Sequence, residues 1–414
     1  MKKTNILVIF AIVIITLTAT LSAEVSDGKT EWDDGILYWK SDDGKFSTRM
    51  DARIYINGAY FFDDTENILS NQTNLRKARF ALKTKLWGVW HAEFDLDIAE
   101  EQPEVEDMFI AYTGFKNSHI KFGNFKMPLS LNELTSSRFL TFCERSYTAN
   151  AFETDRHCGL EYSKWGKYGK FNLNLRSAVF GQDLEVEAEK DYEKEVDETG
   201  GGYATRLVSG IDLTNDLFLH TGISSAIQYP DDGKDMMDFK TEPETKIGDI
   251  EFLDTGDIYD VNYCTKIGLE GALQFNNICF QSEYILADVI RLKNLKDASF
   301  SGGYAFVSWI LTGEKRNWSV KDGEFGQIIP KNLKTGAWEV AARYSYLDLS
   351  DEDADILGGI ANNYTFALNW YANPNIKFQF DYTIVDNSKN ANSDGDYDGD
   401  YDFNYIQFMA VVAF

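Results

Sequence analysis

The sequence predicts an all-β protein, a transmembrane antiparallel β-barrel of about sixteen strands, and three observations lead to that prediction. Apolar and polar residues alternate in short segments from about residue 46 to the end of the chain. After the first two dozen residues, no stretch approaches the ~20 apolar residues that a membrane-spanning helix needs. The last segment is amphipathic and ends on an aromatic residue, Phe414.

The N-terminus has the order of a secretory signal. Met1-Lys2-Lys3 is followed by an apolar run from Ile6 to Leu17 and by small residues up to Ala23. We therefore predict a signal peptide over residues 1–23 and export across the inner membrane. A short periplasmic arm over residues 24–45 and the β-barrel over residues 46–414 are expected to follow.

The first predicted strand shows the alternation clearly. Between Phe46 and Phe62 the even positions are mostly apolar, whereas Arg49, Asp51 and Arg53 occupy odd positions. In a soluble sandwich such an ionic face points to solvent, and in a membrane barrel it lines water while the apolar face meets lipid. The amphipathic end at Phe414 resembles the assembly signal of outer-membrane barrels and favours the second arrangement.

The connectors between the predicted strands alternate between short and long. This asymmetry predicts short periplasmic turns and long external loops, in a cylinder that closes because no backbone group can stay unpaired in lipid. The segment from Gly313 to Gly336 is an exception, long where a short turn is due, so two strands could be miscounted there. The strands are expected near 46–62, 74–87, 90–99, 105–113, 118–126, 158–164, 169–180, 203–213, 217–227, 258–273, 278–289, 298–312, 337–349, 361–371, 376–386 and 404–414.

The charge balance excludes nucleic-acid binding. Asp and Glu number 66 against 40 Lys and Arg, a net charge of −26. The acidic runs at 183–198 and 394–402 are predicted to be solvated loops. Calcium binding by 394–402 is the alternative, although this run lacks the EF-hand pattern and its closing Glu.

The sequence shows no pattern typical of a metal, cofactor or catalytic site. The four histidines show no ligand spacing and no Ser/His or Asp/His constellation is visible, so we expect no metal site, no cofactor and no enzyme activity. Four cysteines would enter an oxidising periplasm, where bridges between Cys143 and Cys158 or between Cys264 and Cys279 both stay open.

Several segments carry a family resemblance. Gly123 to Arg145 (GNFKMPLSLNELTSSRFLTFCER) resembles the phosphate-selective porin (porin O and P) family, and four further segments match it: 74–79, 307–314, 336–349 and 358–374. The resemblance implies trimers of sixteen-stranded barrels in the Gram-negative outer membrane, in contact with lipid and lipopolysaccharide. It also implies that the third long loop, 127–157 here, folds into the lumen and that small anions, phosphate or polyphosphate, diffuse passively through the pore.

The same resemblance implies a set of anion-binding residues. Lys126 and Arg138 match pore-lining phosphate ligands of the family, and Arg76 with Lys77 match its basic pair on the second strand. A constriction lined by such cations concentrates anions and offers charge-assisted hydrogen bonds. Salt bridges across strands are the structural alternative for each cation. The candidate pore-lining residues are Lys126, Arg138, Arg76, Lys77, Arg79, Arg53, Arg49, Lys83, Lys85 and Lys121.

Two other functions remain open. Acidic loops that fold inward would give a general diffusion pore with weak or cation selectivity. A plugged lumen would instead give a non-conducting structural or adhesive barrel at the cell surface.

Overall fold

The computed structural model describes residues 28–33, 36–62, 68–99, 103–181, 199–230, 235–248, 250–397, 399 and 401–414. The predicted signal peptide and the acidic run at 183–198 lie outside these residues. Within them, no helix is long and apolar enough to cross a membrane.

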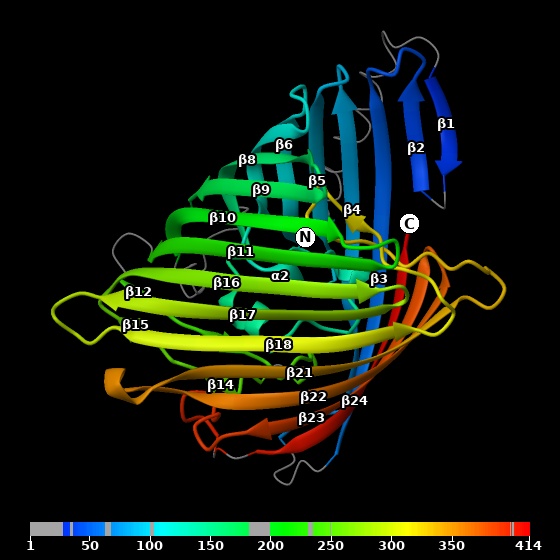
Figure 1. The fold of residues 1–414 in the computed structure, drawn as a ribbon. Coiled ribbons are helices and arrows are strands. Elements are labelled where there is room, and N and C mark those ends of the chain that lie inside the picture. The colour runs from blue at the N-terminus through cyan, green and yellow to red at the C-terminus, as the bar shows by residue number, and fades with distance from the viewer. Residues whose placement is uncertain are drawn as a thin grey trace, which may run out of the picture.

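Sixteen antiparallel strands close into a barrel (Figure 1). Closure is made by β3 (Ser47–Phe62), which pairs with β4 (Gln72–Leu86) on one side and with the last strand, β24 (Phe403–Ala413), on the other. Every strand predicted from the alternation overlaps an observed one. The remaining strands are β5 (Trp90–Asp97), β6 (Glu104–Tyr112), β7 (Ser118–Lys126), β8 (Arg156–Tyr168), β9 (Phe171–Phe180), β10 (Thr199–Asp212), β11 (Leu217–Pro230), β16 (Val261–Phe275), β17 (Ile278–Arg291), β18 (Ala298–Ile310), β21 (Ala337–Asp351), β22 (Ile356–Asn373) and β23 (Ile376–Asn387).

A hairpin precedes the barrel, within the segment predicted as an N-terminal arm. It consists of β1 (Gly28–Asp33) and β2 (Ile36–Ser41). From Arg53 onward, β3 pairs with β24. The part of β3 before Arg53 pairs with β2, with Met50 opposite Leu37. The hairpin therefore extends the sheet beyond the C-terminal end of β24.

The two faces of the barrel wall differ in chemistry. In β22 the large apolar side chains of Tyr364, Phe366 and Leu368 are exposed, whereas Thr365 and Asn363 between them are buried. This order, with apolar side chains outward and polar ones inward, is the reverse of that in a water-soluble protein. It is the arrangement expected of a barrel surrounded by lipid.

The third long connector, 127–155, contains α2 (Leu131–Leu134), the 3-10 helix η1 (Ser137–Phe139) and α3 (Tyr147–Phe152). It bonds to strands far away in the sequence. Glu283 of β17 accepts the backbone N–H groups of Leu131 and Asn132 at 2.6 and 2.8 Å, and Asp381 of β23 accepts that of Cys143 at 2.8 Å. These buried acceptors fix the backbone of the connector.

An apolar core joins α3 to the connector between β11 and β16. That connector carries the short strands β12 (Met236–Met237), β13 (Lys240–Thr241), β14 (Leu253–Asp254) and β15 (Ile258–Tyr259). The ring of Phe239 contacts that of Phe152 edge to face and that of Phe300 at a tilt, with centroids 5.7 and 5.5 Å apart. Buried side chains of β16 to β24 and of β3 complete this core.

The connector from Gly313 to Gly336 is long where a short turn was expected. It contains two short strands, β19 (Trp318–Ser319) and β20 (Glu324–Phe325), which pair only with each other. It adds no strand to the barrel, so the predicted count of sixteen is confirmed. A second 3-10 helix, η2 (Glu352–Ala354), connects β21 to β22.

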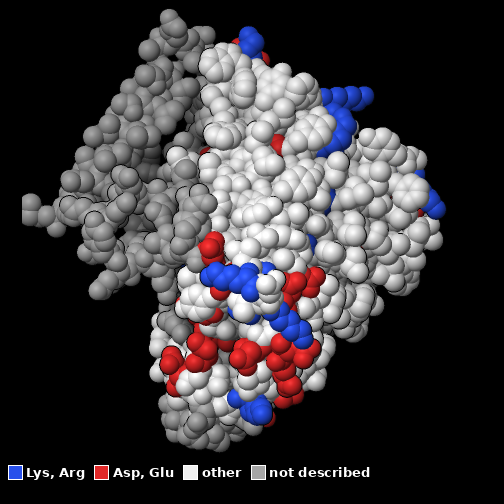
Figure 2. Space-filling view, turned by 90° about the vertical axis from the view of Figure 1, so that its left-hand side faces the viewer, with Lys and Arg blue, Asp and Glu red and all other residues white. Residues whose placement is uncertain are grey.

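Charged residues gather at the end of the barrel where the long connectors lie. Figure 2 views this end and shows Asp and Glu mixed with Lys and Arg over one part of it. Ion pairs link neighbouring connectors here, such as Lys293 with Asp260 at 2.5 Å and Lys296 with Asp353.

The four cysteines, Cys143, Cys158, Cys264 and Cys279, are free thiols, so neither of the bridges left open by the sequence is present. Among the described residues, the carboxylates grouped closely enough to hold a metal ion are Glu133, Glu153 and Asp155 rather than members of the 394–402 run. Residues 398 and 400 of that run lie outside the description, and calcium binding there stays a prediction.

Candidate functional site

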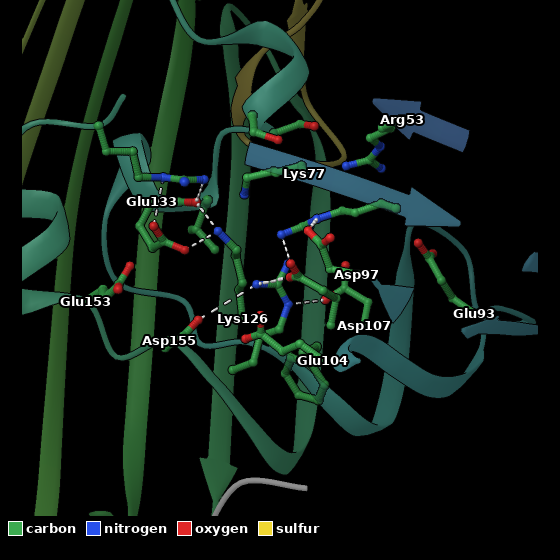
Figure 3. Close-up of a pocket in the computed structure, with 18 of the residues that line it drawn as sticks. Arg53, Lys77, Glu93, Asp97, Glu104, Asp107, Lys126, Glu133, Glu153 and Asp155 are labelled. Atoms are coloured by element: carbon green, nitrogen blue, oxygen red, sulfur yellow. Dashed lines mark hydrogen bonds and ion pairs between the residues drawn. The ribbon is translucent and has the colours of Figure 1, made fainter. Parts of the chain in front are cut away.

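A polar cavity inside the barrel has a volume of about 460 Å³. It is lined by strands β3 to β9, by the 127–155 connector and by residues near β20, and we call it the polar cavity (Figure 3). Its basic lining residues are Arg53, Arg76, Lys77, Arg79, Lys83, Lys121, Lys126, Arg145, Arg156, Arg176 and Lys246. Its acidic lining residues are Glu93, Asp97, Glu104, Glu106, Asp107, Glu133, Glu144, Glu153, Asp155, Asp322 and Glu324. Eleven cations thus face eleven carboxylates, and the lining has no formal net charge.

The strand period explains why β4 contributes so many cations. Lys77, Arg79 and Lys83 occupy alternate positions and therefore share the inward face of the strand. The intervening Ala78 and Phe80 face outward. A single strand with basic residues at odd positions thus gives one wall of the cavity its positive charge.

One group of ion pairs fastens the 127–155 connector to the wall. Arg76 Nε lies 2.7 Å from Glu144 Oε1, Lys126 pairs with Glu133, and Arg145 Nε lies 2.8 Å from Glu133 Oε2. Burial alone would disfavour ionised Glu133, but Arg145 and Lys126 outweigh it and lower the pKa of this carboxyl to about 2. Lys126, the last residue of β7, is therefore engaged by a carboxylate of the 127–155 connector.

A second group of ion pairs joins β4, β5, β6 and β8. Arg156 Nη1 lies 2.6 Å from Glu106 Oε2, and its Nε lies 3.0 Å from Asp107 Oδ1. Arg79 Nε lies 3.1 Å from Asp97 Oδ2, and Arg79 also pairs with Glu106. Two arginines and three carboxylates thus pair across neighbouring strands, and one negative formal charge is left over.

A third group centres on Glu161, which is fully buried. Its carboxylate receives Arg176 Nη2 at 2.7 Å, Lys121 Nζ at 3.3 Å and His119 Nε2 at 3.0 Å. Ion pairs, either across strands or with carboxylates of the connectors, therefore engage most of the basic residues of the cavity.

Lys77 and Arg53 depart from this pattern. Neither has an ion pair with a described residue, although Lys77 is only 8% exposed. Its neighbours Arg76 and Arg79 are themselves cations. In Figure 3 the Lys77 and Arg53 side chains lie on the same side of the polar cavity. A buried ammonium without a partner is costly, so this side of the cavity is suited to receive an anion.

The polar cavity contains seven of the ten candidate cations predicted from the sequence. These are Arg53, Arg76, Lys77, Arg79, Lys83, Lys121 and Lys126. Arg49 and Lys85 do not line it; Arg49 Nε pairs with Asp51 at 2.7 Å, and Lys85 is exposed near the end of β4.

Arg138 also lies outside the polar cavity. It borders a separate cavity of about 20 Å³ beside Phe139 and Lys377. Burial, followed by the charge of the neighbouring Arg53, lowers the pKa of the Arg138 guanidinium. Lys126 and Arg138, the two residues implied most directly by the family resemblance, do not line a common cavity.

Four basic residues that line the cavity were not predicted from the sequence, and neither was any of the acidic ones. The four are Arg145, Arg156, Arg176 and Lys246. Arg145, Glu133 and Glu144 all lie within the segment that carried the family resemblance. Their signal was therefore present in the sequence, but only the folded connector shows which of them meet.

The closed sheet with its apolar outer face and charged interior defines an outer-membrane β-barrel of the channel-forming class. The family model of the phosphate-selective porins O and P matches residues 49–414, and the chain belongs to this family. Family and fold place it in the outer membrane of a Gram-negative bacterium.

Two relatives match over most of the chain. Porin O of Pseudomonas aeruginosa is 23% identical over 390 residues, which cover 86% of each protein. An uncharacterised protein of Caulobacter vibrioides is 25% identical over 304 residues, 71% of this chain and 59% of that protein.

Solved structures show the same fold at low sequence identity. OmpT of Vibrio cholerae covers 91% of this chain and 99% of its own with a TM-score of 0.55 at 10% identity. The anion-selective porin from Comamonas acidovorans covers 89% and 100%, with a TM-score of 0.54 at 13% identity.

Proposed function

We propose that this protein is a passive outer-membrane channel for small anions of the phosphate type. Lys77 carries the proposal, because its side-chain amino group is buried, forms no ion pair with a described residue and lines the polar cavity. An anion beside Lys77 and Arg53 would supply the missing negative charge. Lys offers a compact charge and Arg a planar pair of donors, a combination that suits phosphate oxygens.

The remaining cations of the cavity have a different role in this proposal. Because carboxylates neutralise them, they form a polar wall rather than a continuous ladder of binding sites. Moderate affinity at one place favours release, which transport requires as much as binding. We therefore expect anion preference to be mild.

The third long connector is proposed to narrow the lumen. Its side chains supply part of the cavity lining, and its backbone bonds to strands from β17 to β23. These contacts support a connector that restricts the space open to solutes.

A weakly cation-selective diffusion pore is the second candidate function. The eleven carboxylates of the cavity and the chain's net charge of −26 favour it. Acidic connectors at the mouth act on ions only within about a Debye length, ~8 Å at physiological salt, so the interior should dominate selectivity.

We also propose how the chain is exported, how it assembles and what surrounds it. We propose that residues 1–23 direct export and that residues 24–45 lie on the periplasmic side. One solved structure of Vibrio cholerae OmpT is described as a trimer form, at 9% identity and a TM-score of 0.53. We propose a homotrimer for this chain as well, with outer-membrane lipid and lipopolysaccharide around it.

Block of single-channel chloride current by inorganic phosphate tests the anion site. In planar bilayers, phosphate should reduce the current of the native protein, and Lys77→Gln should raise the half-blocking concentration by about tenfold, which corresponds to ~1.4 kcal/mol. Arg53→Gln should raise it as well. Lys85→Gln is the matched control, because Lys85 lies on the same face of β4 but outside the cavity.

Two results would count against the proposal. Absence of phosphate block in the native channel, or equal block in the Lys77→Gln channel, removes the anion site. Failure of the folded protein to conduct at all would favour the plugged surface barrel.

A further inference from the structure

Three carboxylates lie across the polar cavity from Lys77 and Arg53: Glu104 and Glu153, which have no ion pair with a described residue, and Asp155, which is 3.8 Å from Arg156. Figure 3 shows Glu104, Asp155 and Glu153 on the side opposite these two cations. All five side chains line the same space of about 460 Å³. The cavity therefore has one wall with unsatisfied positive charge and a facing wall with unsatisfied negative charge.

Glu153 has the least compensation among these carboxylates. Its carboxylate oxygens lie within 4.8 Å of those of Glu133 and Asp155, two groups of the same sign. The ammonium of Lys266 contacts the backbone carbonyl of Glu153 at 3.1 Å rather than its carboxylate. Burial, reinforced by Glu133 and Asp155, raises the pKa of Glu153 well above its ordinary value. Glu153 has no ion pair with a described residue, and its carboxyl shares a hydrogen bond with that of Glu133.

Asp155 and Glu104 extend the same wall. Asp155 is 56% exposed, and its cationic neighbour, Arg156, is 3.8 Å away and already engaged by Glu106 and Asp107. Glu104 is exposed and has no ion pair with a described residue. An ammonium group that entered here would meet carboxylates still able to bind it.

We propose that the polar cavity selects small zwitterions, with a phosphate group at Lys77 and Arg53 and an ammonium group at Glu153, Glu104 and Asp155. This inference rests on the proposed anion site and adds the chemical class that the opposite wall recognises. Inorganic phosphate satisfies only one of the two walls, whereas a phosphorylated amine satisfies both. A lining of zero formal charge suits a solute that carries both signs.

The test compares two probes of similar size that differ in one ammonium group, O-phosphoethanolamine and ethyl phosphate. Each is added to native channels in planar bilayers, and block of the chloride current is measured at neutral pH. O-phosphoethanolamine should block at a concentration lower by about tenfold, the size expected for one partly buried charge pair. In the Glu104→Gln, Glu153→Gln double variant this advantage should fall below about threefold while block by ethyl phosphate stays at its native level.

The outcomes separate the two proposals. Equal block by both probes in the native channel overturns the zwitterion site and leaves the anion site in place. An advantage that persists in the double variant also overturns it. Block by neither probe contradicts the anion site itself. The native comparison needs no variant, so a double variant that does not fold leaves a decisive measurement.

Discussion

Buried carboxylates in the barrel interior depend on the charges they meet, and Glu339 on β21 is a clear case. It is fully buried and accepts hydrogen bonds from Arg316 at 2.6 Å, Tyr371 at 2.7 Å and Asn369 at 3.0 Å. Glu339→Ala would leave the buried Arg316 without its carboxylate. We expect a loss of about 3–5 kcal/mol in the free energy of unfolding.

Urea unfolding of the detergent-refolded protein measures this loss. Glu352→Ala, an exposed carboxylate in η2, serves as the control and should change stability by less than about 0.5 kcal/mol. Equal stability of the two variants would show that the Arg316–Glu339 pair contributes nothing.

Glu324 should make ion selectivity depend on pH. Burial, together with the nearby Asp322, raises the pKa of Glu324 to about 8. The folded state holds this proton more tightly than the unfolded state, so the group is neutral at pH 7 and ionises as pH rises through about 8. Because Glu324 lines the polar cavity, ionisation adds negative charge there. The anion preference should fall between about pH 7 and pH 9.

Reversal potentials measured across this pH range check the prediction, and Glu324→Gln should remove the pH-dependent change. A native channel with the same selectivity at both ends of the range would contradict it.

At the scale of single residues, the sequence predicted positions better than partners. Strand alternation and the family resemblance placed Lys77, Arg79 and Lys126 on the interior face, and all three line the cavity. Their partners depend on how connectors fold. Lys126 and Arg138 are close in sequence, yet η1 and its flanking turns direct them into different cavities.

Among the elements, the β19–β20 hairpin is held to the barrel by a buried polar network. Asn174 Nδ2 donates to the carbonyl of Lys321 at 2.6 Å, and Arg206 Nη2 donates to that of Gly323 at 2.9 Å. Gly323 has a φ of 70°, a conformation that favours glycine. Arg206 is itself paired with Glu270 at 2.7 Å.

Trp318 adds a side-chain contact to this network. Its indole Nε1–H donates to His220 Nδ1 at 3.1 Å, and the His220 Nε2 lies 2.8 Å from Glu270 Oε1. Since an indole can only donate, Nδ1 of His220 must be the acceptor. The hairpin lies between the polar cavity and a second cavity of about 360 Å³ lined by Trp318 and Asp216.

Loosening this hairpin should change the current. Trp318→Ala removes the hydrogen bond to His220 and the ring contacts with His220 and Phe218, each worth about 1 kcal/mol. We expect larger and noisier single-channel currents because the partition between the two cavities becomes mobile. Trp309→Ala, on the outer face of β18, is the control. Indistinguishable current records from the two variants would argue against a partition.

Strands were predicted more reliably than connectors, for a physical reason. The period of two follows from the contrast between lipid and the barrel interior, and most residues of β22 and β17 follow it. Connectors such as 127–155 and 235–258 are positioned by contacts with distant strands, of which Glu283 to Leu131 is one. No local pattern encodes such contacts.

The whole molecule presents apolar side chains on its outside, and a substitution can test whether lipid covers them. Phe366, near the middle of β22, is 54% exposed. Phe366→Lys should destabilise a lipid-embedded barrel by about 2–4 kcal/mol. In a water-soluble protein the same exposed substitution would change stability by less than about 0.5 kcal/mol. Folding equilibria in phospholipid vesicles distinguish the two cases.

The reversal potential of native channels under a tenfold KCl gradient is the most direct measurement of the central claim, that a closed barrel conducts and its interior favours anions. We expect stable conductance steps and a potential of the sign produced by chloride moving faster than potassium. Membranes that stay silent, or a potential of the opposite sign, would contradict it.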